Sequence, residues 1–251
     1  MQLEKGYSLV KNSISQSSID KFFKSFLKIC KFYAPEYFKE KDYSNFECSK
    51  LNRDLIILRE KNALKFSSIY EAIWSANFLS NFYTSNNLAK IAAKFLNVKP
   101  DELCLRSPGF RMDVPHDTRN IYGWHQDSAY DKLNEIPSNG ALVWCPLINT
   151  NFKNGTILLK PGSQCEDNVS TMKKKGEDLV TKQIIVPNKF LKKYKTLSLS
   201  VKKNNCAVMN ANVFHKSGYN SSNKVRFTFV VRFNKILTKD YLPFRKSQIS
   251  L

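Results

Sequence analysis

The sequence predicts an α+β protein in which a helical N-terminal part packs on a mainly β core. Residues 1–100 contain amphipathic segments with helical spacing, and from about residue 103 short β-type runs alternate with turn residues. The chain has 251 residues, of which 42% are hydrophobic and 13% aromatic, so it can bury one sizeable core. We therefore expect a single domain over residues 1–251.

Three stretches of the N-terminal part have the apolar spacing of helices. The first covers residues 17–35, where Ser17 and Asp20 have the spacing of a capping box. Further helices are expected over 64–83 and 87–96. Core packing explains the aromatic residues on these stretches better than cofactor binding does.

The C-terminal part, residues 101–240, is expected to consist of short strands. They are predicted at 103–111, 141–148, 156–160, 183–186, 206–209 and 225–233. Many short strands of this kind indicate a β-sandwich or a closed barrel.

A cluster of metal-ligand residues lies in this β-rich part. In the run His125-Gln126-Asp127, alternation along a strand would put the histidine and the aspartate on one face and the glutamine on the other. A third ligand must come from elsewhere. His215 is the leading candidate, because the chain has three histidines and His116 lies in a loop-like stretch. Two imidazoles and one carboxylate on one face of Fe(II) leave its other positions open.

The motifs that follow give this cluster a context. They are Trp124-His125-Gln126-Asp127, Trp144, the run from Asn154-Gly155 to Pro161-Gly162-Ser163, and His215-Lys216-Ser217 leading through Asn220 to Arg226. Their order and spacing, over residues 103–234, resemble the phytanoyl-CoA dioxygenase family of iron- and 2-oxoglutarate-dependent oxygenases. One departure is Gln164, where the family usually has a histidine that is not a metal ligand.

The resemblance implies the fold and the cofactors. The family has a double-stranded β-helix, or jelly roll, which brings non-adjacent strands together at one mouth. It implies Fe(II) bound by His125, Asp127 and His215, with 2-oxoglutarate and O2 as co-substrates. Arg226 matches the arginine that binds the far carboxylate of 2-oxoglutarate through two parallel charge-assisted hydrogen bonds, and Ser217 matches a hydroxyl that supports it.

Five further residues are candidates for the site. Trp144 matches a family tryptophan that borders the co-substrate pocket. Arg111 and Arg106 lie on the strand leading to the site and are candidates for contact with 2-oxoglutarate or substrate. Arg232 shares strand parity with Arg226 and is a candidate for substrate contact in the same cavity, with a solvated position as the default expectation. Gln126 is a candidate for substrate contact or for bracing its strand. In the family, a segment equivalent to 162–182 often covers the active site, so we expect a lid there or a plain surface loop. The stretch 116–122 is expected to form another loop at the rim.

The expected reaction is hydroxylation of an unactivated C–H bond, with release of succinate and CO2. Asp127 favours hydroxylation over halogenation, because related halogenases replace the carboxylate by a small residue. The expected substrate is a small anionic or carrier-linked metabolite. Two alternatives stay open. One is nucleic-acid dealkylation, since Arg226 and Arg232 superficially resemble the arginine pair of DNA-repair oxygenases; the other is a non-catalytic jelly-roll binding protein.

Composition narrows the partners and the compartment. The chain has 40 basic and 21 acidic residues, a net charge of +19, but the lysines are spread over its whole length, so a nucleic-acid partner is not favoured. The six cysteines form no Cys-x-x-Cys pair and are expected to be structural thiols in a reducing compartment. No apolar run is long enough to span a bilayer or to serve as a signal peptide, so a cytoplasmic protein is expected.

Overall fold

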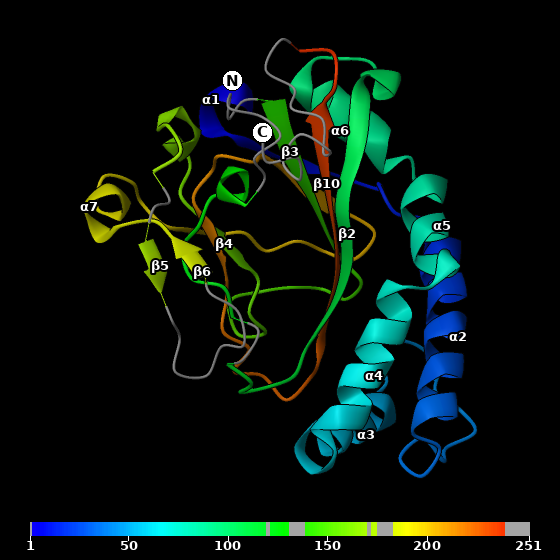
Figure 1. The fold of residues 1–251 in the computed structure, drawn as a ribbon. Helices are drawn as coiled ribbons and strands as arrows, with labels where there is room; N and C mark the ends of the chain where they lie inside the picture. The colour runs from blue at the N-terminus through cyan, green and yellow to red at the C-terminus, as the bar shows by residue number, and fades with distance from the viewer. Residues whose placement is uncertain (1, 119–120, 131–138, 170–171, 175–182, 239–251) are drawn as a thin grey trace, which may run out of the picture.

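In the computed structural model, two antiparallel sheets face each other and helices cover the outer face of the larger one (Figure 1). The structure describes residues 2–118, 121–130, 139–169, 172–174 and 183–238. The larger sheet contains, in spatial order, β1 (Tyr7–Val10), β8 (Cys206–Asn210), β3 (Gly140–Pro146), β10 (Arg226–Lys235) and β2 (Leu103–Asp113). The smaller sheet contains β7 (Leu197–Ser198), β4 (Ile157–Leu159) and β9 (His215–Ser217), and β5 (Met172–Lys174) pairs with β6 (Gln183–Ile185). Two facing antiparallel sheets are the arrangement expected of a jelly roll.

The helices lie mainly in the N-terminal part. Those beside the larger sheet are α2 (Gln16–Tyr33), α3 (Ser49–Lys61), α4 (Ala63–Trp74), α5 (Asn77–Ser85) and α6 (Leu88–Leu96). Shorter helical elements are α1 (Gln2–Lys5), α7 (Asn188–Leu191) and the 3₁₀ helices η1 (Pro100–Glu102), η2 (Asp127–Ala129) and η4 (Ser163–Cys165).

The helix predictions need three corrections. The α2 helix is capped by Ser15, which has extended geometry and accepts a hydrogen bond from the Ser18 backbone N–H at 3.1 Å, whereas Ser17 already lies inside the helix. The helix expected over 64–83 is interrupted after Trp74 and forms α4 and α5. The sequence does not predict α3, whose Asn52 side chain accepts a hydrogen bond from the Val225 backbone N–H at 2.6 Å and so ties the helix to the start of β10.

All six predicted strands are present, with ends shifted by a few residues. The strands that the sequence does not predict are short: β1, β5, β7 and β9. β1 lies within the N-terminal part expected to be helical, and it pairs with β8 at the edge of the larger sheet. Within the expected lid, the described residues form η4 and the β5 strand, whereas residues 170–171 and 175–182 lie outside the described residues. Residues 119–120 of the expected rim loop also lie outside them.

Phenylalanines fill the space between the helices and the larger sheet. Phe22 of α2 lies 5.0 Å from Phe110 of β2, and Phe46 lies 4.6 Å from Phe227 of β10, between ring centroids. All four side chains are buried. The aromatic stripe of α2 therefore serves the core, as expected. The opposite face of the sheet carries a second, smaller apolar cluster that includes Leu142, Trp144 and Val230, together with the polar groups of the cavity.

The pairing of β2 with β10 contains a register shift that decides which side chains face inward. Val230 is paired with Gly109 and Arg232 with Arg106, so Ser107 and Pro108 stand opposite the single residue Val231. A bulge of this kind inverts the alternation of side chains beyond it. As a result, Arg106 faces the same cavity as Arg111 although the two positions differ by an odd number.

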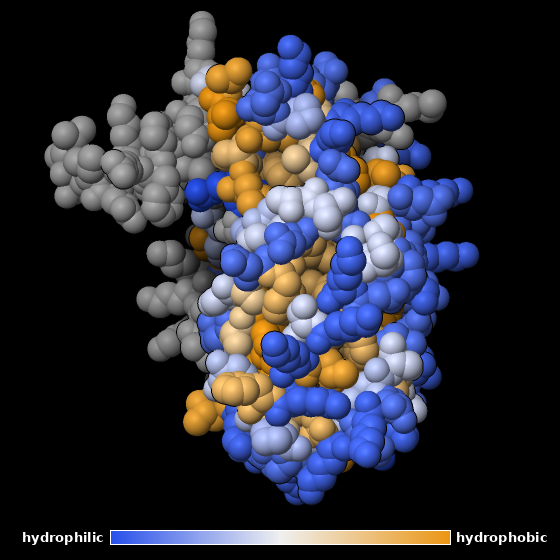
Figure 2. Space-filling view, turned by 90° about the vertical axis from the view of Figure 1, so that its right-hand side faces the viewer, coloured by the Kyte–Doolittle hydropathy of each residue, from blue (hydrophilic) through white to orange (hydrophobic). Residues whose placement is uncertain are grey.

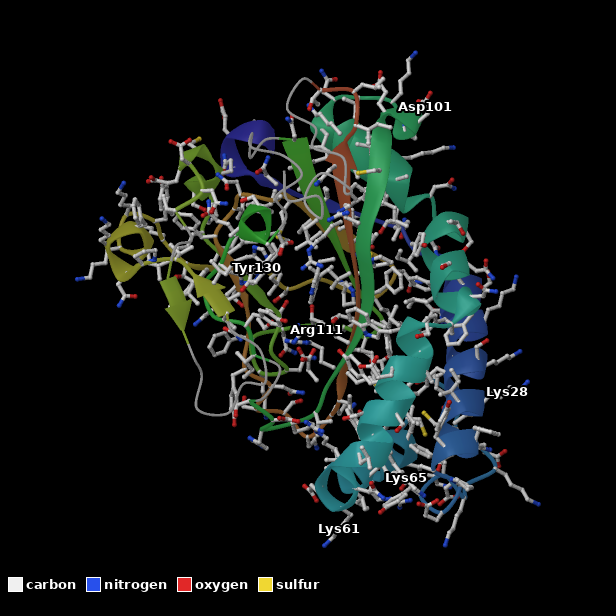
Figure 3. The ribbon with its side chains drawn as sticks, viewed as in Figure 1. Lys28, Lys61, Lys65, Asp101, Arg111 and Tyr130 are labelled. Carbon is white, nitrogen blue, oxygen red and sulfur yellow. The ribbon has the colours of Figure 1, made fainter. Side chains whose placement is uncertain are left out.

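The outward surface of the helical layer is mainly hydrophilic, with separate apolar patches (Figure 2). Lys28 and Lys61 point away from this layer, whereas Arg111 points inward between the sheets (Figure 3). Among the described residues, no helix has the length and apolar character needed to cross a membrane.

Candidate metal centre

The metal-ligand candidates are brought together by a backbone bridge. His125 and His215 form an isolated antiparallel β-bridge, in which each N–H donates to the other residue's carbonyl oxygen at 3.0 and 3.1 Å. Residues paired in this way project on one side, and the two ring centroids are 4.2 Å apart. Asp127 is the first residue of η2. The expected strand alternation therefore ends at Gln126, but the turn still carries the carboxylate to both imidazoles.

Hydrogen bonds orient both histidine rings. The Nδ1 atom of His125 lies 2.7 Å from the Gly123 carbonyl oxygen, and the Nδ1 atom of His215 lies 2.9 Å from the Val213 carbonyl oxygen. A carbonyl can only accept, so each Nδ1 carries the proton and each Nε2 offers a lone pair. Burial, followed by the proximity of His125, lowers the pKa of His215 to about 4, so this ring is neutral near pH 7.

The carboxylate of Asp127 completes the group. Its Oδ1 atom lies 3.6 Å from His125 Nε2 and 3.8 Å from His215 Nε2. Burial raises the pKa of Asp127, but Arg232 and the two histidines lower it by more. The net pKa lies well below the ordinary value, so the carboxyl group is ionised. The three ligand atoms lie within 4.8 Å of one another, and all three residues are buried. Two imidazole nitrogens and one carboxylate oxygen fit a non-haem Fe(II) ion whose remaining positions are open.

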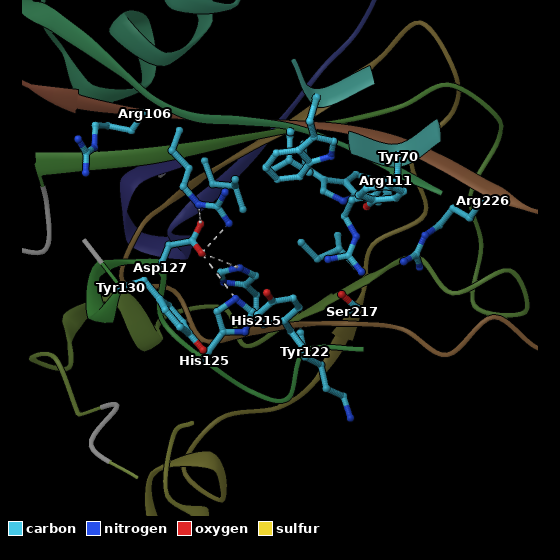
Figure 4. A pocket seen from close by; sticks show the side chains of 18 residues that line it. Tyr70, Arg106, Arg111, Tyr122, His125, Asp127, Tyr130, His215, Ser217 and Arg226 are labelled. Atoms are coloured by element: carbon cyan, nitrogen blue, oxygen red, sulfur yellow. Dashed lines mark hydrogen bonds and ion pairs between the residues drawn. The ribbon is translucent and has the colours of Figure 1, made fainter. Parts of the chain in front are cut away.

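The triad lies in a cavity of about 400 Å³ between the sheets. Near the three ligands, Figure 4 shows Ser217 and Arg226 on one side and Arg106 on the other. Trp144 also lines the cavity, from the central strand β3. The cavity thus has cationic groups on both sides of the metal ligands.

One side of the cavity is a pair of arginines held by an acid. Asp113 accepts hydrogen bonds from Arg226 Nη2 at 2.8 Å and from Arg111 Nη2 at 2.8 Å, and Arg226 Nη1 donates to the Gly218 carbonyl oxygen at 3.3 Å. Two guanidiniums against one carboxylate leave a net positive charge next to Ser217. Sequence reasoning missed Asp113, although its position two residues after Arg111 on the same strand was a usable signal.

Two glycine-containing motifs of the sequence have structural roles here. Gly155 has a φ of +81°, and a Cβ atom there would lie 2.7 Å from Arg226 Nη1 and 2.6 Å from the Gly218 carbonyl oxygen. The absence of a side chain at Gly155 therefore leaves room for the guanidinium of Arg226. In the Pro-Gly-Ser turn, Ser163 Oγ accepts from the Phe214 N–H at 2.8 Å and donates to the Lys160 carbonyl oxygen at 2.7 Å, which fixes the backbone next to His215.

The remaining candidates fall into two groups. Arg106 and Arg232 both line the cavity, but the guanidinium of Arg232 is bonded to Asp127. Gln126 is fully buried and does not line the cavity. It donates to Asn212 Oδ1 at 2.6 Å and accepts from the Val169 N–H at 3.0 Å, so it fastens the described start of the 162–182 segment to the metal-ligand turn.

Apart from Trp144, the aromatic residues of the cavity wall were not found from the sequence. Tyr70 and Trp74 of α4 line the cavity together with Tyr122 and Tyr130. Trp74 is 46% exposed and is fixed by a hydrogen bond from Nε1 to the Phe110 carbonyl oxygen at 2.8 Å. The helical spacing of Tyr70 and Trp74 indicated core packing, and nothing local in the sequence shows that α4 ends at the cavity.

Comparisons with known proteins agree with this geometry. A family model, phytanoyl-CoA dioxygenase (PhyH), matches residues 3–228. No curated protein sequence matches the chain. The solved structures with similar folds include the carbocyclase SnoK from nogalamycin biosynthesis, described as non-haem and α-ketoglutarate-dependent (TM-score 0.59, 14% identity, 99% of this chain and 88% of that chain). They also include the epimerase SnoN in complex with Fe³⁺, α-ketoglutarate and nogalamycin RO (TM-score 0.57, 11% identity, 93% and 80%), and the non-haem monooxygenase ThoJ as a nickel complex (TM-score 0.55, 16% identity, 92% and 74%). The expected jelly-roll class is confirmed.

Proposed function

Because the chain belongs to the phytanoyl-CoA dioxygenase family of iron- and 2-oxoglutarate-dependent oxygenases, we propose that it hydroxylates an unactivated C–H bond of a small anionic metabolite. One atom of O2 would enter the product as a hydroxyl group and the other would enter succinate, with release of CO2. The observation that carries the proposal is the buried convergence of His125, Asp127 and His215 inside a cavity with cationic groups on both sides.

We assign the two sides of the cavity to two anions. Arg226, oriented by Asp113, would bind the far carboxylate of 2-oxoglutarate with support from Ser217, while Arg111 and Trp144 border the same space. Arg106, on the other side of the triad, would bind an acidic group of the substrate. Trp74 would contact an apolar or ring-shaped part of the substrate, since its ring lines the cavity and is held in place.

Hydroxylation is the proposed outcome because the chain keeps the metal-binding carboxylate. Asp127 occupies the position at which a halogenase would need room for a halide ion. The similar structures include a monooxygenase, an epimerase and a carbocyclase. The mass of the product therefore has to be measured, since a gain of one oxygen atom supports hydroxylation and a loss of two hydrogen atoms contradicts it.

The first experiment tests the cofactor site without a substrate. Fe(II) and 2-oxoglutarate are added to the purified protein in the absence of air, and the visible charge-transfer absorption of the complex is recorded. We expect absorption with the natural chain and none with Asp127→Ala. Asp101→Ala, at an exposed position outside the cavity, is the matched control and should behave like the natural chain. Absence of the absorption with the natural chain would support a non-catalytic binding protein.

The second experiment identifies the substrate class. Succinate formation is measured across phosphate-, carboxylate- and coenzyme-A-bearing metabolites, with methylated oligonucleotides as the nucleic-acid arm. We expect stimulation by an anionic metabolite, and a higher substrate concentration for half-maximal rate in Arg106→Gln with no change for 2-oxoglutarate. Stimulation by the oligonucleotides alone would favour the dealkylation alternative.

A further inference from the structure

The ion pair between Arg232 and Asp127 has a geometry that bears on metal coordination. Arg232 Nε donates to Asp127 Oδ2 at 2.9 Å, and Arg232 Nη2 donates to Asp127 Oδ1 at 3.1 Å. The two planar groups thus meet through two parallel hydrogen bonds, the strongest form of this pair. The Asp127 side chain is 4% exposed, so the pair is well shielded on the carboxylate side.

The two oxygens of Asp127 have different surroundings. Oδ1 is the atom that lies 3.6 and 3.8 Å from the two histidine Nε2 atoms, whereas Oδ2 makes the shorter hydrogen bond to Arg232. A free carboxylate can bind a cation through one oxygen or through both. Both oxygens accept from the guanidinium, but Oδ1 is the one nearer to the two histidine nitrogens, while the shorter bond holds Oδ2 on the Arg232 side. In this orientation Oδ1 is the oxygen presented to the metal.

We propose that Arg232 is a positioning residue that holds Asp127 as a one-oxygen ligand and thereby keeps a metal position free for the co-substrate. A second carboxylate oxygen on the metal would take up a position that 2-oxoglutarate or O2 needs. Arg232 therefore acts through Asp127, which differs from the substrate contact that its strand parity suggested. The inference rests on the proposed function for the identity of the co-substrate.

The chain offers a matched control for this role. Arg59 Nε donates to Asp117 Oδ2 at 2.8 Å, and both side chains are about one-tenth exposed. The carboxylate is shielded in both pairs, although the Arg232 side chain is 32% exposed, and neither Arg59 nor Asp117 lines the cavity. The same substitution at Arg59 therefore measures the general cost of removing an arginine from a shielded carboxylate.

The test uses Ni(II) as a redox-inert probe and needs no turnover. Affinities are measured by calorimetry for Ni(II), and then for 2-oxoglutarate with the Ni(II)-loaded protein, in the natural chain, Arg232→Gln and Arg59→Gln. We expect Arg232→Gln to weaken 2-oxoglutarate binding by about 10- to 100-fold, equivalent to about 1.4–2.8 kcal/mol for displacing the second carboxylate oxygen, while Ni(II) binding is not weakened. X-ray absorption of Ni(II)-loaded Arg232→Gln should show the short metal–carbon distance of a carboxylate bound through both oxygens. Arg59→Gln should change neither affinity.

The outcomes are separable from those of the proposed function. Failure of the natural chain to bind 2-oxoglutarate would overturn the proposed function, and the inference with it. Unchanged 2-oxoglutarate binding in Arg232→Gln, or a loss in Ni(II) affinity alone, would overturn the inference and leave the proposed function standing. Arg232→Lys keeps the charge but lacks the planar fork, so it is the variant to use if Arg232→Gln does not fold. We expect it to weaken 2-oxoglutarate binding in the same direction, and binding equal to that of the natural chain would count against the inference.

Discussion

The two faces of β10 show how one strand builds both the core and the site. On one face lie residues that pack against the helices: Phe227, Phe229, Val231 and Phe233. On the other face lie residues that line the cavity: Arg226, Val230 and Arg232. Both faces are largely removed from water. The first is held by apolar packing alone, whereas on the second Val230 packs in a smaller apolar cluster and the two arginines make directional, charge-assisted hydrogen bonds.

This difference predicts different tolerance to substitution. Apolar packing depends mainly on volume, so side chains of similar size can replace one another at modest cost. A buried charge depends on a partner at a fixed distance and angle, so even a conservative change leaves an uncompensated group. Substitutions of the charged residues on the cavity face should therefore cost more, or change ligand binding more, than substitutions on the helix face.

The largest effect on stability is expected from Asp113→Asn. This change removes the negative charge shared by Arg111 and Arg226 and leaves two shielded guanidiniums uncompensated. We expect the free energy of unfolding to fall by about 3–5 kcal/mol in urea denaturation. Asp101→Asn, at an exposed position, should change it by less than about 0.5 kcal/mol. A similarly small loss in Asp113→Asn would show that the cavity face is as tolerant as the core face.

The same group predicts a pH dependence. Burial raises the pKa of Asp113, but Arg111 and Arg226 lower it more, so it lies well below the ordinary value of 3.8. In acid the unfolded chain takes up the proton before the folded protein does, so the stabilisation by this carboxylate is complete above the ordinary pKa and is lost as the pH falls below it. The difference in unfolding free energy between the natural chain and Asp113→Asn should be the same at about pH 7 and about pH 5, and should shrink as the pH falls from about 4 to about 2. A constant difference would mean that another feature of the side chain is responsible.

Arg226→Lys should change co-substrate binding more than stability. Lysine keeps the charge but cannot make two parallel hydrogen bonds to a carboxylate. We expect the 2-oxoglutarate concentration for half-maximal succinate formation to rise by about 10- to 100-fold, equivalent to about 1.4–2.8 kcal/mol. Arg59→Lys, which alters an ion pair away from the cavity, should leave this concentration unchanged. Equal behaviour of the two variants would remove Arg226 from the co-substrate site.

On the helix face, Phe229→Leu should cost about 1–2 kcal/mol of unfolding free energy. Phe229 is fully buried and its ring lies 4.6 Å from that of Phe82, so a smaller side chain leaves a small void but no unpaired group. The half-saturating concentration of 2-oxoglutarate should not change. A change in that concentration would show that the two faces of β10 are coupled through the backbone.

The sequence pattern predicted which side of its strand a residue faces better than it predicted which residue across the cavity it contacts. The parity of β10 follows from its apolar neighbours, so Arg226 could be placed on the cavity side from the sequence. Arg106 lies on that side because of the bulge at Ser107 and Pro108, and a register shift of this kind depends on the pairing with β10. Alternation alone would have placed Arg106 with Phe110 on the helix side.

The partner of Arg232 was beyond sequence reasoning for a physical reason. Asp127 precedes Arg232 by 105 residues, and each side chain alone is explained by another role, as a metal ligand or as a solvated strand residue. The short strand β9 was also missed, because its three residues are fixed by pairing with β4 and by the bridge to His125. Local propensity carries no signal for contacts of this range.

The smallest effect is expected at Thr228, between the two arginines of the cavity face. Thr228 is fully buried and its Oγ1 has no hydrogen-bond partner among the described residues. Thr228→Val keeps the shape and removes this unsatisfied hydroxyl, so unfolding free energy should change by less than about 0.5 kcal/mol or rise. Thr156→Val is the matched control, because Thr156 is equally buried but donates to the Leu199 carbonyl oxygen at 2.6 Å, and we expect it to cost about 1–3 kcal/mol. If Thr228→Val proved as costly as Thr156→Val, the cavity face would depend on a polar contact at Thr228 as well as on its charged pairs.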